Sequence, residues 1–228
     1  MILEYNHEQI ELGRVFDSIP RDAVVVDVGC GRGRNLDVLT RLGFLNLIGV
    51  DVNPSLLEIV KEKGYIGFTP EEFGSKFKNA CADAILLSHI VEHFEYRPLL
   101  DFLAVYLERL KPGGNMVVAT PLMSEMFYND FDHVKPYLPL GFSMVFARGP
   151  EQIQCQSDHM LSLQSIRFFR APFRLQWHSV FYVQDGPKWP LWINRGLRLL
   201  FLLSKGRCGR RSGWIGRYRY EGRRTKQG

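Results

Sequence analysis

A short glycine-rich segment does most to limit what this chain can fold into. Residues 24–28 are valines interrupted only by Asp27, and glycines follow at alternate positions, Gly29, Gly31 and Gly33. Consecutive apolar residues are typical of a parallel strand that is buried on both faces. Glycine adopts positive φ angles and lets the backbone approach a ligand closely. Because residues at helical spacing follow, the segment predicts a strand, a ligand-binding turn and a helix whose free N–H groups point at the ligand.

A second acidic residue narrows the kind of ligand. Asp51 ends an expected second strand at 46–51, and Asn53 and Pro54 begin a helix. A carboxylate at this strand end can accept hydrogen bonds from both ribose hydroxyls of an adenosine. Dinucleotide-binding folds share this device, but their glycine spacing is Gly-x-Gly-x-x-Gly, whereas this chain has Gly-x-Gly-x-Gly. A nicotinamide dinucleotide is therefore disfavoured.

Together these residues resemble the class I S-adenosylmethionine-dependent methyltransferases, whose first motif has the form acid-x-Gly-x-Gly-x-Gly. Residues 83–93 resemble the fourth strand of that family and the loop after it, and residues 110–121 resemble its fifth strand. The resemblance covers residues 20–145. It implies an α/β fold, namely a Rossmann-like, doubly wound, mostly parallel seven-stranded sheet with helices on both faces. It also implies an enzyme that uses S-adenosyl-L-methionine as methyl donor.

The resemblance also implies which residues hold this cofactor. The three glycines would frame its methionine moiety, Asp51 would hold the ribose, and residues 69–72 would flank the adenine. Asp27 would support the loop or accept a hydrogen bond from the cofactor's ammonium group. The expected cofactor-binding residues are Asp27, Gly29, Cys30, Gly31, Gly33, Asp51, Val52 and Ser88.

Polar residues follow the expected fourth and fifth strands, where the methyl acceptor would lie. A helix opening after the fourth strand would place His89, Glu92 and His93 on one face. Another polar run, 128–137, follows the fifth strand and contains His133. Because the ordinary pKa of histidine lies near neutrality, a histidine can act as general base for a hydroxyl acceptor. His93 and His133 are the candidate catalytic residues.

Two other uses of this cluster stay open. His89, Glu92, His93 and His133 could bind a divalent metal that orients vicinal hydroxyls. That set is similar to the metal ligands of small-RNA 2′-O-methyltransferases and related quinone O-methyltransferases, except that His89 replaces their first glutamate. Alternatively, Glu92 and His93 only cap a helix or shape the cofactor pocket.

The positive charge is concentrated near the C-terminal end. The net charge is +5, yet residues 195–224 carry nine arginines and one lysine against a single acid, Glu221. We therefore expect a methyltransferase domain at 1–185 and a basic, aromatic extension at 186–228, with a helix followed by a flexible tail over Cys208–Arg224. The apolar run within 189–205 is too short to span a bilayer, but it could pack on the domain or lie at a membrane surface.

The closing strands of the sheet are harder to place. Residues 142–147 and 175–183 are the expected strands, with short strands within 150–172. The four cysteines lack the spacing of a zinc site or a disulfide framework, and no secretory signal is visible, so we expect a cytoplasmic protein, with peripheral contact at the inner membrane surface as an option.

The expected reaction is O-methylation of a small-molecule, sugar or lipid-linked acceptor. Residues 132–137 favour this acceptor class because they resemble a segment of bacterial methyltransferases of polysaccharide and lipid-linked sugar pathways. The alternatives are an RNA ribose methyltransferase, because the basic tail could follow phosphates, and a non-catalytic cofactor-binding protein.

Overall fold

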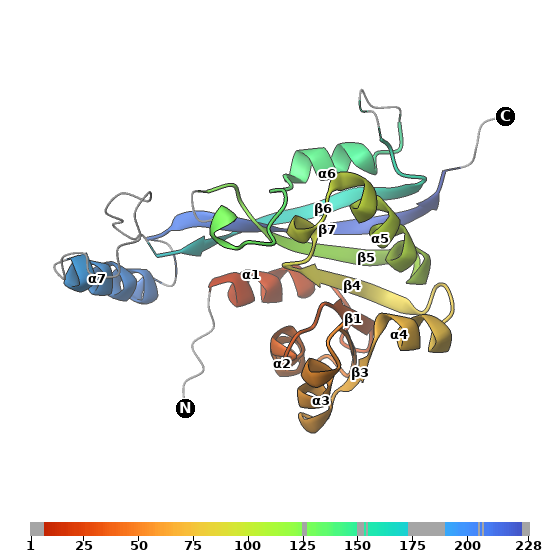
Figure 1. Cartoon of the computed structure of the whole chain (residues 1–228), viewed down its shortest axis with the longest axis horizontal. Helices are drawn as coiled ribbons and strands as arrows, with labels where there is room; N and C mark the ends of the chain where they lie inside the picture. Colours follow the sequence, from red (N-terminus) through yellow and green to blue (C-terminus); the bar gives the residue numbers. More distant parts are fainter. Residues whose placement is uncertain are drawn as a thin grey trace.

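Strands and helices alternate along most of the chain (Figure 1). The computed structural model describes residues 7–124, 127–149, 153, 155–172, 190–204, 206 and 208–224. In the N-terminal part the elements are α1 (His7–Phe16), β1 (Val24–Val28), α2 (Arg34–Arg41), β2 (Asn46–Val50), α3 (Pro54–Glu62), β3 (Ile66–Phe68), α4 (Pro70–Lys76), β4 (Ala82–Ser88), the 3-10 helix η1 (Val91–His93), α5 (Tyr96–Arg109) and β5 (Leu110–Pro121). They are followed by the 3-10 helix η2 (Phe127–Asn129), α6 (Pro139–Val145), β6 (His159–Ala171), α7 (Pro190–Leu203) and β7 (Arg210–Arg223).

The described strands form one mixed sheet in the order β3-β2-β1-β4-β5-β7-β6. The pairs among β1 to β5 are parallel, whereas β7 is antiparallel to both β5 and β6. Because the strand order reverses beside β1, the carboxyl ends of β1 and β4 meet at the position where such sheets bind ligands. The expected Rossmann-like, doubly wound, mostly parallel seven-stranded sheet is confirmed.

Alternate residues of each central strand enter two separate hydrophobic layers. Val26, Ile85 and Trp214 face the layer beneath α4, α5 and α6. Their neighbours Val25, Leu86 and Ile215 face the layer beneath α1, α2 and α3. All six side chains are fully buried. The valine run is therefore apolar because each of its faces meets a helix layer, as the sequence indicated.

Helix starts follow the expected polar signals. The Asn53 side chain accepts a hydrogen bond from Ser55 N at the start of α3. At the start of α4, the Thr69 hydroxyl accepts from Glu72 N while the Glu72 carboxylate accepts from Thr69 N. This reciprocal pair confirms the expected helix cap after the third strand.

Two expectations about the segment after β5 are wrong. The strand expected at 142–147 is the helix α6, which starts with Pro139 and buries Phe142 and Phe146 one turn apart. The short strands expected within 150–172 are one long strand, β6. The strand expected at 175–183 lies outside the described residues.

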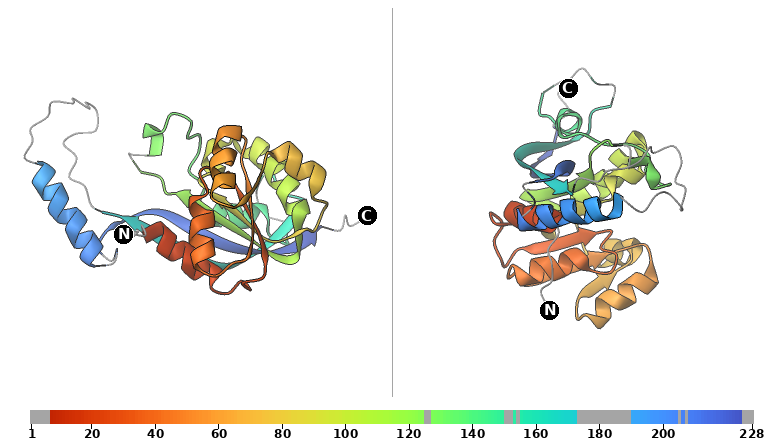
Figure 2. Two further views of the ribbon diagram at one scale, coloured as in Figure 1. Left: turned by 90° about the horizontal axis from the view of Figure 1, so that it is seen from below. Right: turned by 90° about the vertical axis from the view of Figure 1, so that its left-hand side faces the viewer.

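The flexible tail expected over Cys208–Arg224 is also wrong. Residues 210–223 form β7, which lies inside the sheet between β5 and β6. Trp214 and Tyr218 are fully buried, and a side chain at Gly213 would collide with the Phe169 ring of β6. The sheet therefore uses strands on both sides of the expected boundary at residue 185. The helix expected in the extension is present as α7, which lies beyond the end of the β6–β7 pair (Figures 1 and 2).

Candidate functional site

The glycine loop after β1 is shaped to receive a ligand. Gly29, Gly31 and Gly33 all have positive φ angles, of 71°, 53° and 75°. A Cβ atom on Gly29 would collide with Ile90 Cδ1, so the loop after β4 packs directly on the glycine loop. A Cβ atom on Gly31 would meet no atom within 4 Å. Gly31 is therefore the position where backbone faces open space.

Asp27 lies beneath this loop with its charge uncompensated. Its side chain is fully buried, and neither carboxylate oxygen has a hydrogen-bond partner within the described residues. Burial raises the pKa of Asp27 to about 7; the nearby Asn35 side chain opposes that rise and the Asp51 carboxylate adds to it. A buried carboxylate without a partner is costly, so a cationic ligand group at this position would stabilise it. The ammonium group of S-adenosylmethionine fits that requirement.

Asp51 joins the end of β2 to the glycine loop. One carboxylate oxygen accepts a hydrogen bond from Gly31 N at 2.8 Å, and the other accepts from Asn53 N at 2.9 Å. Each oxygen has a further lone pair, so the carboxylate can still accept hydrogen bonds from ribose hydroxyls. The predicted ribose contact therefore fits the geometry and stays a prediction.

The remaining expected cofactor residues differ in what they offer. Cys30 is buried, and burial raises the pKa of its thiol to about 12, so it packs as a neutral group. A side chain at Gly49 would press on its Sγ atom. Val52 is 81% exposed, two residues after the end of β2, and its contact with the cofactor stays a prediction. Ser88 ends β4 beside Ala119 of β5.

The loop after β4 differs from the expected helix. Val91–His93 form only a short 3-10 helix, and His89 precedes it with a left-handed φ of 57°. The expectation that His89, Glu92 and His93 share one helical face is therefore wrong. Left-handed backbone is rare for a residue with a side chain, and it is common at functional sites.

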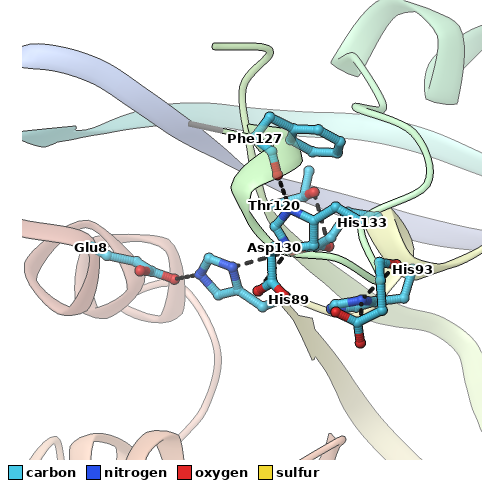
Figure 3. Close-up of polar contacts among 9 residues, drawn as sticks. Glu8, His89, His93, Thr120, Phe127, Asp130 and His133 are labelled. Carbon is cyan, nitrogen blue, oxygen red and sulfur yellow. Dashed lines mark hydrogen bonds and ion pairs between the residues drawn. The ribbon is translucent and has the colours of Figure 1, made fainter. Parts of the chain in front are cut away.

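His89 lies between two carboxylates instead (Figure 3). Its Nε2 is 2.8 Å from Glu8 Oε1 on α1, and its Nδ1 is 3.1 Å from Glu92 Oε1. Desolvation of the ring opposes its charged form, but the hydrogen bonds and charges of Glu8 and Glu92 outweigh this and raise the pKa of His89 to about 10. His89 is thus an imidazolium with both nitrogens engaged, and it has no lone pair to offer a metal or a proton.

Glu92, His93 and His133 come together beside this pair. Their ligand atoms lie within 4.8 Å of one another, and the rings of His93 and His133 meet edge to face with centroids 4.9 Å apart (Figure 3). The Glu92 backbone carbonyl accepts hydrogen bonds from Val134 N and Lys135 N. These bonds hold the segment after β5 against η1, which brings the two predicted catalytic histidines together.

In both rings Nδ1 lies against a backbone carbonyl. His133 Nδ1 is 2.8 Å from Phe127 O, and His93 Nδ1 is 3.2 Å from Asp132 O. Because a carbonyl oxygen only accepts, Nδ1 donates in each neutral ring and the lone pair is then on Nε2; in His133 this Nε2 faces the Asp130 carboxylate, with Oδ2 3.6 Å away. The same arrangement orients histidines that ligate metals or act as bases.

Two residues at this site were not expected from the sequence. Glu8 reaches His89 from α1, and Thr120 donates from its hydroxyl to the fully buried Glu92 Oε2 at 3.0 Å. Thr120 is at the end of β5 and could have been suspected from its position after that strand. Glu8 gives no such signal, because its contact with His89 depends on where α1 lies.

Comparison with known proteins identifies the class. A family described as "Methyltransferase domain" matches residues 9–181. That range is well over half of the chain and contains the glycine loop, both acidic residues and the histidine pair. The chain belongs to this family and is an S-adenosylmethionine-dependent methyltransferase.

Curated relatives include enzymes with different acceptors. The chain is 30% identical over 110 residues to the tRNA (carboxymethyluridine(34)-5-O)-methyltransferase of Xenopus tropicalis, a match that covers 47% of this chain and 17% of that protein. It is 30% identical over 127 residues to the 2-methyl-6-phytyl-1,4-hydroquinone methyltransferase of Synechocystis, covering 51% and 37%. It is 34% identical over 107 residues to the ubiquinone biosynthesis O-methyltransferase of Brucella anthropi, covering 42% and 40%. The chain thus matches less than half of each relative's length.

Solved structures share the fold. A methyltransferase from Archaeoglobus fulgidus has a TM-score of 0.62 at 20% identity, covering 92% of each chain. The 1,6-didemethyltoxoflavin-N1-methyltransferase of Burkholderia thailandensis, solved with bound S-adenosylhomocysteine, has a TM-score of 0.58 at 11% identity and covers 94% of this chain and 79% of that one.

Proposed function

We propose that this methyltransferase transfers the methyl group to a hydroxyl oxygen of a small-molecule, sugar or lipid-linked acceptor. The observation that carries the proposal is the pair of half-buried histidines, His93 and His133, each with Nδ1 against a backbone carbonyl; His133 Nε2 also lies 3.6 Å from the Asp130 carboxylate. His93 follows β4 on the loop that packs against Gly29, and His133 lies on the segment after β5. The proposed setting is the cytoplasm, where the four free cysteines of the chain would stay reduced.

For this reaction the protein must position the acceptor and the cofactor and remove one proton from the acceptor. S-adenosyl-L-methionine, when bound, supplies a methyl group already activated by its sulfonium. Asp27 would pair with its ammonium group, and Asp51 would hold its ribose. An Nε2 lone pair of His93 or His133 would take the acceptor's hydroxyl proton as the oxygen attacks. The hydrogen bonds from Nδ1–H to backbone carbonyls hold both rings in one orientation and stabilise the protonated ring.

A divalent metal is the alternative use of the same side chains. Glu92 supplies a buried carboxylate whose Oε1 pairs with His89 Nδ1 at 3.1 Å and keeps a further lone pair, and one nitrogen from each of His93 and His133 completes a three-ligand set. A carboxylate with two imidazoles suits a catalytic zinc ion, and such a site leaves a position for the acceptor. Isothermal titration of the purified, chelator-treated protein with Zn²⁺ and with Mg²⁺ tests this directly. Binding that is lost in both His93→Ala and His133→Ala would favour the metal.

The activity test uses radiolabelled S-adenosylmethionine with fractionated cell extract, with and without EDTA. We expect label in an extractable small-molecule or lipid fraction, and a loss of at least about a hundredfold in rate for His133→Ala or His93→Ala. S-adenosylhomocysteine binding should be unchanged in both variants, because neither residue is assigned to the cofactor. Retention of full activity by the double variant would refute the proposed base.

A nucleic-acid acceptor is the second candidate, because one relative is a tRNA methyltransferase and the chain is basic near its C-terminal end. Label in tRNA rather than in the small-molecule fraction, with binding that weakens steeply as salt rises, would favour it. Label in neither fraction, with intact S-adenosylhomocysteine binding, would favour the non-catalytic alternative.

A further inference from the structure

The helix α7 has two apolar faces, and the other described parts of the chain cover only one of them. Its inner face includes Ile193, Leu197 and Phe201, spaced one turn apart and half-buried or buried. Phe201 packs on the ring of His7 with centroids 6.2 Å apart, and its ring fills the space beside Gly209. This face holds α7 to α1 and to the start of β7.

The outer face exposes leucines. Leu199 is 57% exposed, Leu200 is 51% exposed and Leu203 is 74% exposed, and their spacing places all three on one side of the helix. Arg195 and Arg198 are also exposed, and Arg195 lies one turn before Leu199. We name these five residues the α7 docking face. The sequence of α7 contains no acidic residue.

The α7 docking face lies at the acceptor end of the sheet. Gly213 of β7 pairs with Pro121, the last residue of β5, so the start of β7 lies at the edge from which the acceptor loops extend. Figures 1 and 2 both place α7 beyond the same end of the molecule as η2. His7, on which Phe201 packs, is followed by Glu8, which binds His89.

We propose that the α7 docking face binds the surface of an anionic membrane and so presents the acceptor loops to the lipid. Exposed leucines beside arginines, without acids, match an interface with hydrocarbon below and negatively charged headgroups above. The face is a protruding helix rather than a groove, which suits a planar surface. Among the described residues, no helix is long and apolar enough to cross a bilayer. The proposal goes beyond the reaction, since it does not depend on which group is methylated.

The test is sedimentation of the full chain with vesicles. One set contains phosphatidylcholine alone, and the other contains about three parts phosphatidylcholine to one part phosphatidylglycerol. We expect binding to the anionic vesicles at least about tenfold stronger than to the neutral ones, weakened by salt. Leu199→Glu with Leu203→Glu should reduce it by at least about tenfold. Leu45→Glu is the matched control, because Leu45 is 78% exposed and lies just before β2; it should bind like the unaltered chain.

Two measurements keep the outcome clear. S-adenosylhomocysteine binding should be the same in all variants, which shows that the cofactor domain is intact. Light scattering should show that the oligomeric state is the same with and without the two substitutions. Failure to bind anionic vesicles, or binding unaffected by the leucine substitutions, would overturn the proposal. A dimer that the substitutions dissociate would also overturn it, because the face would then serve a second copy of the chain.

Discussion

Replacing Asp27 with asparagine should stabilise the ligand-free protein and impair cofactor binding at the same time. Asparagine has nearly the same shape but no charge, so the change removes a carboxyl group whose ionisation burial opposes. The pKa of Asp27 rises from its ordinary 3.8 to about 7 because the side chain is fully buried. At about 1.4 kcal/mol for each tenfold change in an equilibrium, that difference is worth ~4 kcal/mol.

The direction of the pH dependence follows from the raised pKa. The folded protein holds the Asp27 proton more tightly than the unfolded chain does, so this group's contribution to stability is complete below pH 3.8 and is lost as pH rises to about 7. Between about pH 5 and pH 8, the unaltered protein should lose ~3 kcal/mol of unfolding free energy from this residue. Asp27→Asn should lack that loss.

Urea denaturation of both proteins without ligand, followed by circular dichroism at about pH 5 and pH 8, measures the difference. S-adenosylhomocysteine titration provides the second readout. Its affinity for the unaltered protein should rise with pH up to about 7, because the ionised carboxylate is the form that pairs with an ammonium group. Asp27→Asn should weaken it roughly tenfold to a hundredfold without that pH dependence. Equal pH dependence of stability in the two proteins would refute the reasoning.

Three further predictions concern the loop and the core. Gly31→Ala should keep the fold at a cost of about 1–2 kcal/mol in thermal unfolding, yet abolish S-adenosylhomocysteine binding. Gly29→Ala should also disrupt folding, because Ile90 occupies the space that the new Cβ atom would need. Equal stability of the two variants would contradict this prediction. Asp51→Asn should lower the melting temperature and weaken cofactor binding by about tenfold, because one amide oxygen cannot replace both carboxylate acceptors. Unchanged affinity in calorimetry would contradict the ribose assignment. Trp214→Ala should cost about 3–5 kcal/mol in urea denaturation, because the side chain is fully buried.

Local patterns predicted the fold of the N-terminal half of the protein well. The turn after β1 needs glycines, and the end of β2 presents Asp51, so residues adjacent in sequence encode that geometry. The same holds for the cap formed by Thr69 and Glu72 at the start of α4. Where a few consecutive residues determine a local structure, that structure can be predicted from the sequence.

Long-range pairing explains what the sequence did not reveal. The strand β7 reads as an arginine-rich tail, and its burial depends on insertion between β5 and β6 rather than on its own pattern. The left-handed backbone of His89 and its contact with Glu8, 81 residues away, likewise depend on packing. The pairing of His93 with His133 was expected, because loops after neighbouring parallel strands meet at one edge.

The position of β7 has a consequence for how the chain is made. Its antiparallel partner β6 precedes it by nearly forty residues and has no other neighbour among the described strands, so β6 stays unpaired until residues 210–223 have left the ribosome. Trp214 and Ile215 then close both hydrophobic layers together. The core of this enzyme is therefore finished only after residues 210–223 have been synthesised, and a nonsense mutation before residue 210 would leave the sheet open rather than merely remove a basic segment.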